Sequence, residues 1–320
     1  MRNWSRTRVN GFRTITTLMS ASVLAAGVVS PAWAVRPGGG GGGGSSNGPS
    51  GNDVSYPQCG STLPSSPAFA IVGVNGGLAN NLNSCFGPSS SYPSYTQSEL
   101  YWATTSATGT GITTQPKVGL YVNTADPGNE YNGTPINDWP TSSDPTKDPW
   151  GSCGTTTILT SSNTSATVGE NSPACAWQYG YNMASQDLMR LVNAAGAINK
   201  QETTLSISSS PSQYGWWLDV ETANSWQGGS SGQEMNAADL QGMYDALTSA
   251  SSATKVGIYS TSSQWSSIAG NYFSLALPDW IPGARTQSGA ISNCSLAPFS
   301  GGPVTVTQWT SHSLDSDYTC

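Results

Sequence analysis

Positive charge is scarce in this chain, and histidine is almost absent. Only 9% of the 320 residues are charged, with 11 Lys or Arg against 18 Asp or Glu, and there is a single histidine. Proteins that bind nucleic acid or anionic lipid present clustered basic residues to those partners. We therefore expect neither nucleic acid nor a lipid surface as a partner.

The scarcity of histidine also limits the chemistry of the chain. The sequence has no phosphate-binding loop, no GxGxxG after a strand and no zinc-ligand spacing. We expect no cofactor and no metal, and we interpret His312 as a surface-loop residue.

Long hydrophobic runs are missing except at the amino terminus. Four arginines precede an apolar run from Ile15 to Val29, and "PAWA" ends at Ala34. This order of basic, apolar and small residues is typical of an export signal, whereas an uncleaved anchor would need a longer, uninterrupted run. We expect residues 1–34 to be a signal peptide and the protein to be secreted, extracellular and without a membrane span. The remaining chain has seven basic and 18 acidic residues, a net charge of −11.

Only six cysteines occur, all after this signal and without a CxxC pair. Export places them in an oxidising compartment, which favours three disulfides over a metal site. Sequential pairing is the simplest of the fifteen connectivities, and the sequence leaves the others open. It would join Cys59 to Cys85, Cys153 to Cys175, and Cys294 to Cys320.

Composition divides the rest of the chain into a linker and a single domain. Residues 35–52 are rich in Gly, Ser and Pro and predict a disordered linker. Residues 53–320 show no second linker and predict one domain of the size of a (β/α) barrel. Residues 125–175 are rich in Pro, Gly, Ser, Thr and Asn, a composition that predicts a long excursion between a strand and the helix that follows it.

Short apolar runs alternate with helical patterns along that domain, which favours an α/β fold with a parallel sheet. Helices are predicted over residues 98–104, 177–198 and 237–250. Strands are predicted over residues 69–74, 117–123, 214–220, 255–260, 278–282 and 304–309.

The stretch "WWLDVET" places two acids, Asp219 and Glu221, in an otherwise apolar run. Side chains two apart on a strand share a face, so both acids should project together while Leu218 and Val220 pack on the other side. They follow a predicted strand, and in parallel α/β folds reactive groups collect at the carboxyl ends of the strands. The alternatives are a helix cap or acids paired with Arg or Lys. Asp53 and the pair Asp315 and Asp317 occupy similar positions near the first and last predicted strands.

Aromatic and amide side chains near predicted strand ends could bind a sugar. Aromatic rings stack on pyranose faces, and their polar atoms can donate hydrogen bonds. Paired carboxylates are best known from glycosidic cleavage, in which one acid protonates the leaving oxygen. The candidate substrate-binding residues are Tyr56, Asn75, Tyr121, Asn123, Trp226, Tyr259 and Trp309.

Several blocks of the sequence together resemble one enzyme family. "DVSYPQ" at 53–58, "FAIVGVNGG" at 69–77, "LDVET" at 218–222, "VGIYSTSSQW" at 256–265 and "VTQWTS" with "DSD" at 306–317 occur in the order used by family 25 glycoside hydrolases. These are lysozyme-type N-acetylmuramidases. The chain also resembles the glycoside hydrolase-like domain of exported actinobacterial proteins.

The resemblance implies a single irregular, TIM-like (β/α) barrel with fewer helices than strands. It also implies roles: Glu221 as general acid, Asp219 as the acid that assists the reacting sugar, and Asp53 as the first-strand carboxylate. Asp317, with Asp315 as the second choice, would be the carboxylate after the last strand. We expect a secreted, lysozyme-like hydrolase that cleaves peptidoglycan or a related N-acetylated glycan of the cell wall. The alternatives are a non-catalytic glycan-binding protein on the same barrel and a surface protein that binds other proteins.

Overall fold

The structure is a computed structural model that describes residues 49–311 and 314–320. The expected export signal, most of the expected linker and His312 lie outside these residues. Among the residues described, no helix has the length and apolar character needed to cross a membrane.

Eight strands close into a barrel in the order β1-β12-β11-β10-β9-β8-β3-β2. Seven strands run parallel, and β12 runs antiparallel to both of its neighbours, β1 and β11. The barrel is therefore mixed, and the expected all-parallel sheet is wrong in one strand. The strands are β1 (Ser50–Val54), β2 (Ala70–Gly73), β3 (Val118–Asn123), β8 (Gly215–Asp219), β9 (Lys255–Tyr259), β10 (Asp279–Ala284), β11 (Val304–Ser311) and β12 (Leu314–Thr319).

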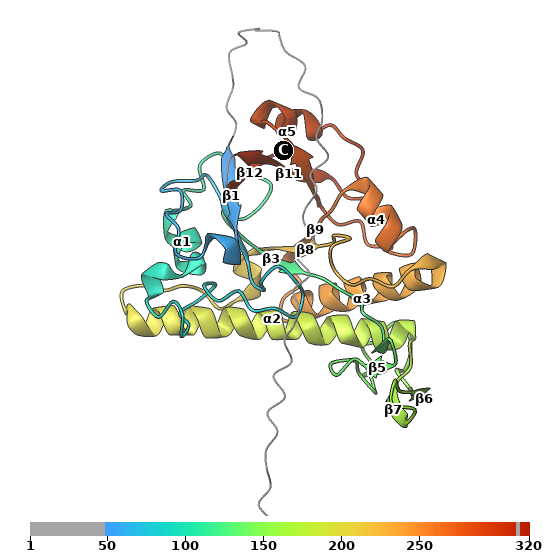
Figure 1. The fold of residues 1–320 in the computed structure, drawn as a ribbon. Helices are drawn as coiled ribbons and strands as arrows, with labels where there is room; N and C mark the ends of the chain where they lie inside the picture. Colours follow the sequence, from blue (N-terminus) through green and yellow to red (C-terminus); the bar gives the residue numbers. More distant parts are fainter. Residues whose placement is uncertain (1–48, 312–313) are drawn as a thin grey trace, which may run out of the picture. The chain divides into compact units, whose positions relative to one another are not determined.

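Five α-helices are found in the described part of the chain, so helices are fewer than strands, as expected. Helix α2 packs along α3, and the two can be followed in Figure 1. Glycines permit this close approach, because a Cβ at Gly180 would lie 2.0 Å from the Asp239 carbonyl oxygen. The helices are α1 (Glu99–Ser106), α2 (Pro173–Gln201), α3 (Gly229–Ser249), α4 (Ser262–Ile268) and α5 (Gln287–Asn293), with single 3₁₀ turns η1 (Tyr56–Gln58), η2 (Tyr95–Gln97) and η3 (Pro211–Gln213).

Strand β8 shows how the alternation of side chains builds two cores. Trp216 and Leu218 belong to the large apolar cluster that includes residues of the helices. Trp217 belongs to a separate cluster with Phe69, Ile71, Trp280 and Val306. The inward face of β8 therefore carries Trp217 and, two residues later, Asp219, while the outward face is apolar, as the sequence predicted.

All six predicted strands exist, but the first three residues of β1 were assigned to the linker and β12 was not predicted. Strand β1 begins at Ser50, inside the range expected to be disordered. Gly51, which indicated a linker in the sequence, is instead a packing residue, since a Cβ there would lie 2.6 Å from the Phe69 ring. Glycine is needed here because the ring occupies the space of a side chain.

The excursion between β3 and α2 contains two small hairpins, which Figure 1 labels in part. They are β4 (Glu130–Tyr131) with β5 (Thr134–Pro135), and β6 (Thr155–Leu159) with β7 (Ser165–Gly169). The Cys153–Cys175 disulfide joins the excursion to the first turn of α2. The other two disulfides, Cys59–Cys85 and Cys294–Cys320, complete the sequential pairing and confirm that prediction.

Candidate active site

A polar cavity of about 220 Å³ lies at the carboxyl ends of the barrel strands. Four carboxylic acids line it, and none of its lining residues is basic. These side chains come from strands that are far apart in the sequence but meet at one end of the barrel. The lining residues are Asp53, Gly77, Tyr121, Asn123, Asp219, Glu221, Tyr259, Trp280, Gln308 and Asp315.

The pair Asp219 and Glu221 lies where β8 ends. The main-chain carbonyl of Asp219 accepts hydrogen bonds from Thr124 N (3.2 Å) and Thr124 Oγ1 (2.7 Å). The indole of Trp226 donates to the Glu221 carbonyl at 2.9 Å. These bonds fix the backbone and leave the carboxyl groups to the cavity, where Asp219 Oδ1 is buried without a hydrogen-bond partner.

Burial and neighbouring acids raise the pKa values of both members of this pair. The pKa of Asp219 is raised well above its ordinary value, first by burial and then by the charges of Glu221 and Asp53. The pKa of Glu221 is also raised by burial, an effect partly offset by a hydrogen bond with the Gln264 side chain.

Strand β12 contributes two acids at different depths. Asp315 pairs in register with Asp53 of β1 and lines the cavity. Asp317 pairs with Gly51, is fully buried, and accepts a hydrogen bond from Trp280 Nε1 at 3.0 Å. Asp317 does not line the cavity, so Asp315 takes the position that we expected for Asp317. Both acids lie within a strand, whereas the sequence placed them after the last one.

A chain of hydrogen bonds orients Asp53. The hydroxyl of Tyr259 donates to Gln308 Oε1 at 3.1 Å, and Gln308 Nε2 donates to Asp53 Oδ2 at 3.0 Å. Because Tyr259 occupies the amide oxygen, Gln308 must present its N–H to Asp53. Asp53 Oδ2 is therefore held as an acceptor.

Asp53 and Asp317 both have raised pKa values. Burial, followed by the charge of Asp315, raises the pKa of Asp53 to about 7, although Gln308 and Asp317 lower it by hydrogen bonding. The pKa of Asp317 is raised well above its ordinary value by burial and then by Asp53. The two carboxyl groups titrate as a coupled pair.

The predicted aromatic residues divide into two groups. Tyr121 and Tyr259 line the cavity, and Tyr56, with 51% of its surface exposed, lies against the lining residue Gly77. Trp226 and Trp309 do not line the cavity. Trp309 follows the cavity residue Gln308 on β11, so its side chain points to the opposite face.

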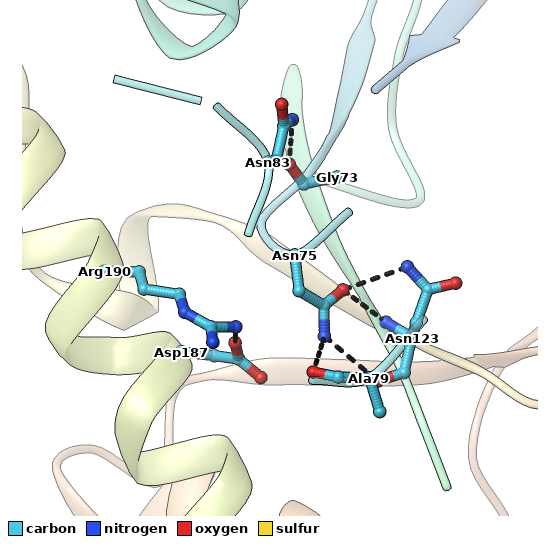
Figure 2. Close-up of polar contacts among 7 residues, drawn as sticks. All are labelled: Gly73, Asn75, Ala79, Asn83, Asn123, Asp187 and Arg190. Carbon is cyan, nitrogen blue, oxygen red and sulfur yellow. Dashed lines mark hydrogen bonds and ion pairs between the residues drawn. The ribbon is translucent and has the colours of Figure 1, made fainter. Parts of the chain in front are cut away.

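Asn75 and Asn123 form a structural connection between β3 and the chain after β2, which Figure 2 shows. Asn75 Oδ1 accepts from Asn123 N at 2.7 Å and from Asn123 Nδ2 at 3.0 Å. Asn75 Nδ2 donates to the carbonyls of Asn123 and Ala79. Asn75 is buried and outside the cavity, so the structure assigns it to the framework, whereas Asn123 lines the cavity.

Basic residues do not neutralise the cavity acids in the part of the chain that the structure describes. The two ion pairs found there are Lys147–Asp144 and Arg190–Asp187. The latter, at 2.6 Å, lies on α2 and is drawn in Figure 2. The interpretation of Asp219 and Glu221 as partners of Arg or Lys is therefore not supported.

Sequence reasoning missed three lining residues: Gly77, Trp280 and Gln308. A signal for Gln308 was present in "VTVTQW", because alternation from the inward-facing Val306 places Gln308 on the same face. Gly77 has a φ of 72°, which favours glycine, and a side chain there would meet the Tyr56 ring.

No protein-family model matches the chain, and no curated protein matches it. Among solved structures, it is similar to the crystal structure of the bacterial lysozyme from Streptomyces coelicolor. The identity is 14% and the TM-score 0.40, over 86% of this chain and 93% of that chain. A similarity at this level carries no argument about activity.

Proposed function

We propose that this protein is a secreted glycoside hydrolase that cleaves peptidoglycan or a related N-acetylated glycan. The observation that carries the proposal is the pair Asp219 and Glu221, which lines a cavity together with Asp53 and Asp315 and without a basic residue. The raised pKa of Glu221 suits a proton donor, and the neighbouring carboxyl groups can stabilise positive charge when they are ionised.

In the proposed mechanism, Glu221 donates a proton to the leaving glycosidic oxygen. Glu221 is the more accessible acid of the pair, and its raised pKa keeps the proton available in the mildly acidic range. The bond between the sugar carbon and the protonated oxygen then breaks, and water adds to the carbon. Water loses a proton that restores the acid.

Asp219 is proposed to assist the reacting sugar. The sugar carbon develops positive charge in the transition state of glycoside cleavage. Carboxyl groups of Asp219, Asp53 and Asp315 surround the cavity, and negative charge on them would stabilise that state. The resemblance to family 25 glycoside hydrolases implies that Asp219 would polarise a 2-acetamido group of the substrate, and an N-acetylated substrate is proposed on that ground.

The decisive test is release of reducing ends from cell walls and from chitin-type oligomers. We expect activity from the wild-type protein, strong loss in Glu221→Gln, and normal activity in Glu130→Gln, which changes an exposed glutamate on β4. Wall binding without turnover by any of the three would favour the glycan-binding alternative. Absence of both binding and turnover would favour a protein-binding surface protein.

Export is proposed from the sequence and needs its own measurement. Amino-terminal sequencing of the protein from culture medium should begin at Val35. A chain that stays in the cell membrane with residues 1–34 attached would contradict secretion.

A further inference from the structure

A second cavity lies at the opposite end of the barrel, where the strands begin. It has a volume of about 510 Å³, and its lining includes Gly215 and Lys255, the first residues of β8 and β9. Trp216, Trp217 and Tyr244 also line it. This volume lies within the range of small-molecule sites, about 300–1,000 Å³.

Four buried polar atoms in the lining of this cavity have no hydrogen-bond partner. They are Gln115 Nε2, Trp217 Nε1, Thr254 Oγ1 and Thr305 Oγ1. The side chains of Trp217 and Thr254 are only 4% and 7% exposed. Leaving a buried polar group unpaired costs about 1–3 kcal/mol, so turning these side chains toward an occupant of the cavity would be favourable.

These atoms share one chemical property, which is that all of them can donate. The indole and amide N–H groups can only donate, and the two threonine hydroxyls can donate or accept. No Asp or Glu is among the lining residues. Lys255 is exposed and has no ion pair within the described residues, so its ammonium group is a further donor.

We propose that this cavity binds a small monocarboxylate with an apolar body, such as a medium-chain fatty acid. The apolar chain would contact Trp216, Tyr244 and the cavity's prolines. The carboxylate would accept hydrogen bonds from Lys255 and from those unpartnered donors whose side chains can rotate toward it. A carboxylate fits better than a hydroxyl because it offers two acceptor oxygens, no donor, and a charge opposite to that of Lys255. The site is separate from the proposed catalytic cavity and does not depend on glycosidase activity.

Calorimetric titration with octanoate and with octanol tests the proposal, since the two probes differ only in the head group. We expect octanoate to bind and octanol to bind at least ten-fold more weakly, because the alcohol lacks the charge and one acceptor oxygen. Failure of octanoate to bind at millimolar concentration would overturn the site, and the cavity would then hold water only. Equal binding of both probes would overturn the assignment of a carboxylate.

Three variants locate the site and its head-group contacts. Lys255→Gln should weaken octanoate binding about two- to five-fold and leave octanol binding unchanged, since partly exposed charge pairs are worth about 0.2–1 kcal/mol. Thr254→Val, which keeps the side-chain shape, should weaken octanoate about ten-fold. Gly215→Leu places a side chain in the cavity beside Pro116 and should abolish binding of both probes.

Lys117→Gln is the matched control, because Lys117 lies outside the cavity and its ammonium group bonds to the Ala107 carbonyl at 3.3 Å. It should bind octanoate like the wild type. Unchanged binding in a folded Gly215→Leu protein would overturn the location. If that variant fails to fold, equal affinities for Lys255→Gln, Thr254→Val and Lys117→Gln would overturn it instead.

Discussion

The two ends of this barrel have opposite chemistry. At the carboxyl end, four acids line a small polar cavity that has no basic residue in its lining. At the amino end, a larger and mainly apolar cavity is lined by Lys255 and by residues with buried, unpartnered donors, and no acid lines it. The inward face of β8 contributes to both cavities. Trp217 lines the amino-end cavity and Asp219, two residues later, lines the carboxyl-end cavity. A short strand is therefore sufficient to separate an acceptor-rich site from a donor-rich one.

The largest expected effect tests whether the carboxyl end is catalytic. Glu221→Gln removes the proposed proton donor while keeping nearly the same shape, and general acid catalysis contributes about 10²–10⁴-fold to rate. Reducing-end assays should show a loss of that size in kcat, with wall binding retained. Normal turnover in Glu221→Gln would remove the functional distinction between the two ends.

A smaller effect is expected at Gln308, which orients Asp53 without being an acid itself. Gln308→Leu removes the hydrogen bond that lowers the pKa of Asp53, so that pKa should rise above about 7. We expect about ten-fold lower kcat and a pH–rate profile displaced to higher pH. Gln287→Leu, which removes an amide bonded to Ser50 instead, is the control. An unchanged profile in Gln308→Leu would contradict the positioning role.

The stability of the protein should fall as pH rises, and acids near the carboxyl end should contribute to this. Asp53 has a pKa of about 7 in the folded protein against about 4 when unfolded, so the folded state binds the proton more tightly. Its stabilising contribution is complete below about pH 4 and is lost as pH rises through about 7. The melting temperature should therefore be several degrees lower at pH 8 than at pH 5.

Asp317→Asn tests the origin of that dependence. This variant removes a fully buried acid whose pKa is raised, so the decline in melting temperature between pH 5 and pH 8 should become shallower. Lys255→Gln, at the amino end, should leave the slope as in the wild type. Identical slopes in all three proteins would show that the acids near the catalytic cavity do not control stability.

The smallest expected effect is that of a chelator, which should change neither end. Within the described chain, the one close group of potential metal ligands is Cys59, Cys85 and Glu99, and both of its sulfurs are bonded in a disulfide. We expect incubation with EDTA to leave both turnover and octanoate binding at wild-type values. Loss of either on chelation, restored by a divalent cation, would contradict the expectation of a metal-free protein.

The carboxyl end was more predictable from the sequence than the amino end. Asp219 and Glu221 stood out because they interrupt an apolar strand, and side-chain alternation placed Leu218 on the opposite face correctly. The burial of each acid was not predictable. Asp315 and Asp317 are two residues apart and so share one face of the strand, and only the register with β1 shows which of them lines the cavity. Strand β12 itself was missed because its sequence, "LDSDYT", is polar on the face that carries the acids.

The amino-end cavity could not be predicted, since most of its lining residues lie just before strands or at their beginnings. Gln115, Thr254 and Thr305 are ordinary polar residues in the sequence, and only the fold shows that their donors lack partners. Likewise, Asn75 resembled a binding residue because it follows a strand. Its hydrogen bonds to Asn123 show that it holds two chain segments together.

The pairing of β1 with β12 has a consequence for the time at which the site can form. Asn52 donates to the carbonyl of Asp315, 263 positions later in the sequence, so Asp53 and Asp315 meet only when these distant segments associate. Contacts of such high sequence separation slow folding, because a long loop must close before they form. During synthesis or export, the chain must therefore present residues 314–319 before the barrel closes. The carboxylates stay apart until then, and any activity of this site begins with the last strand.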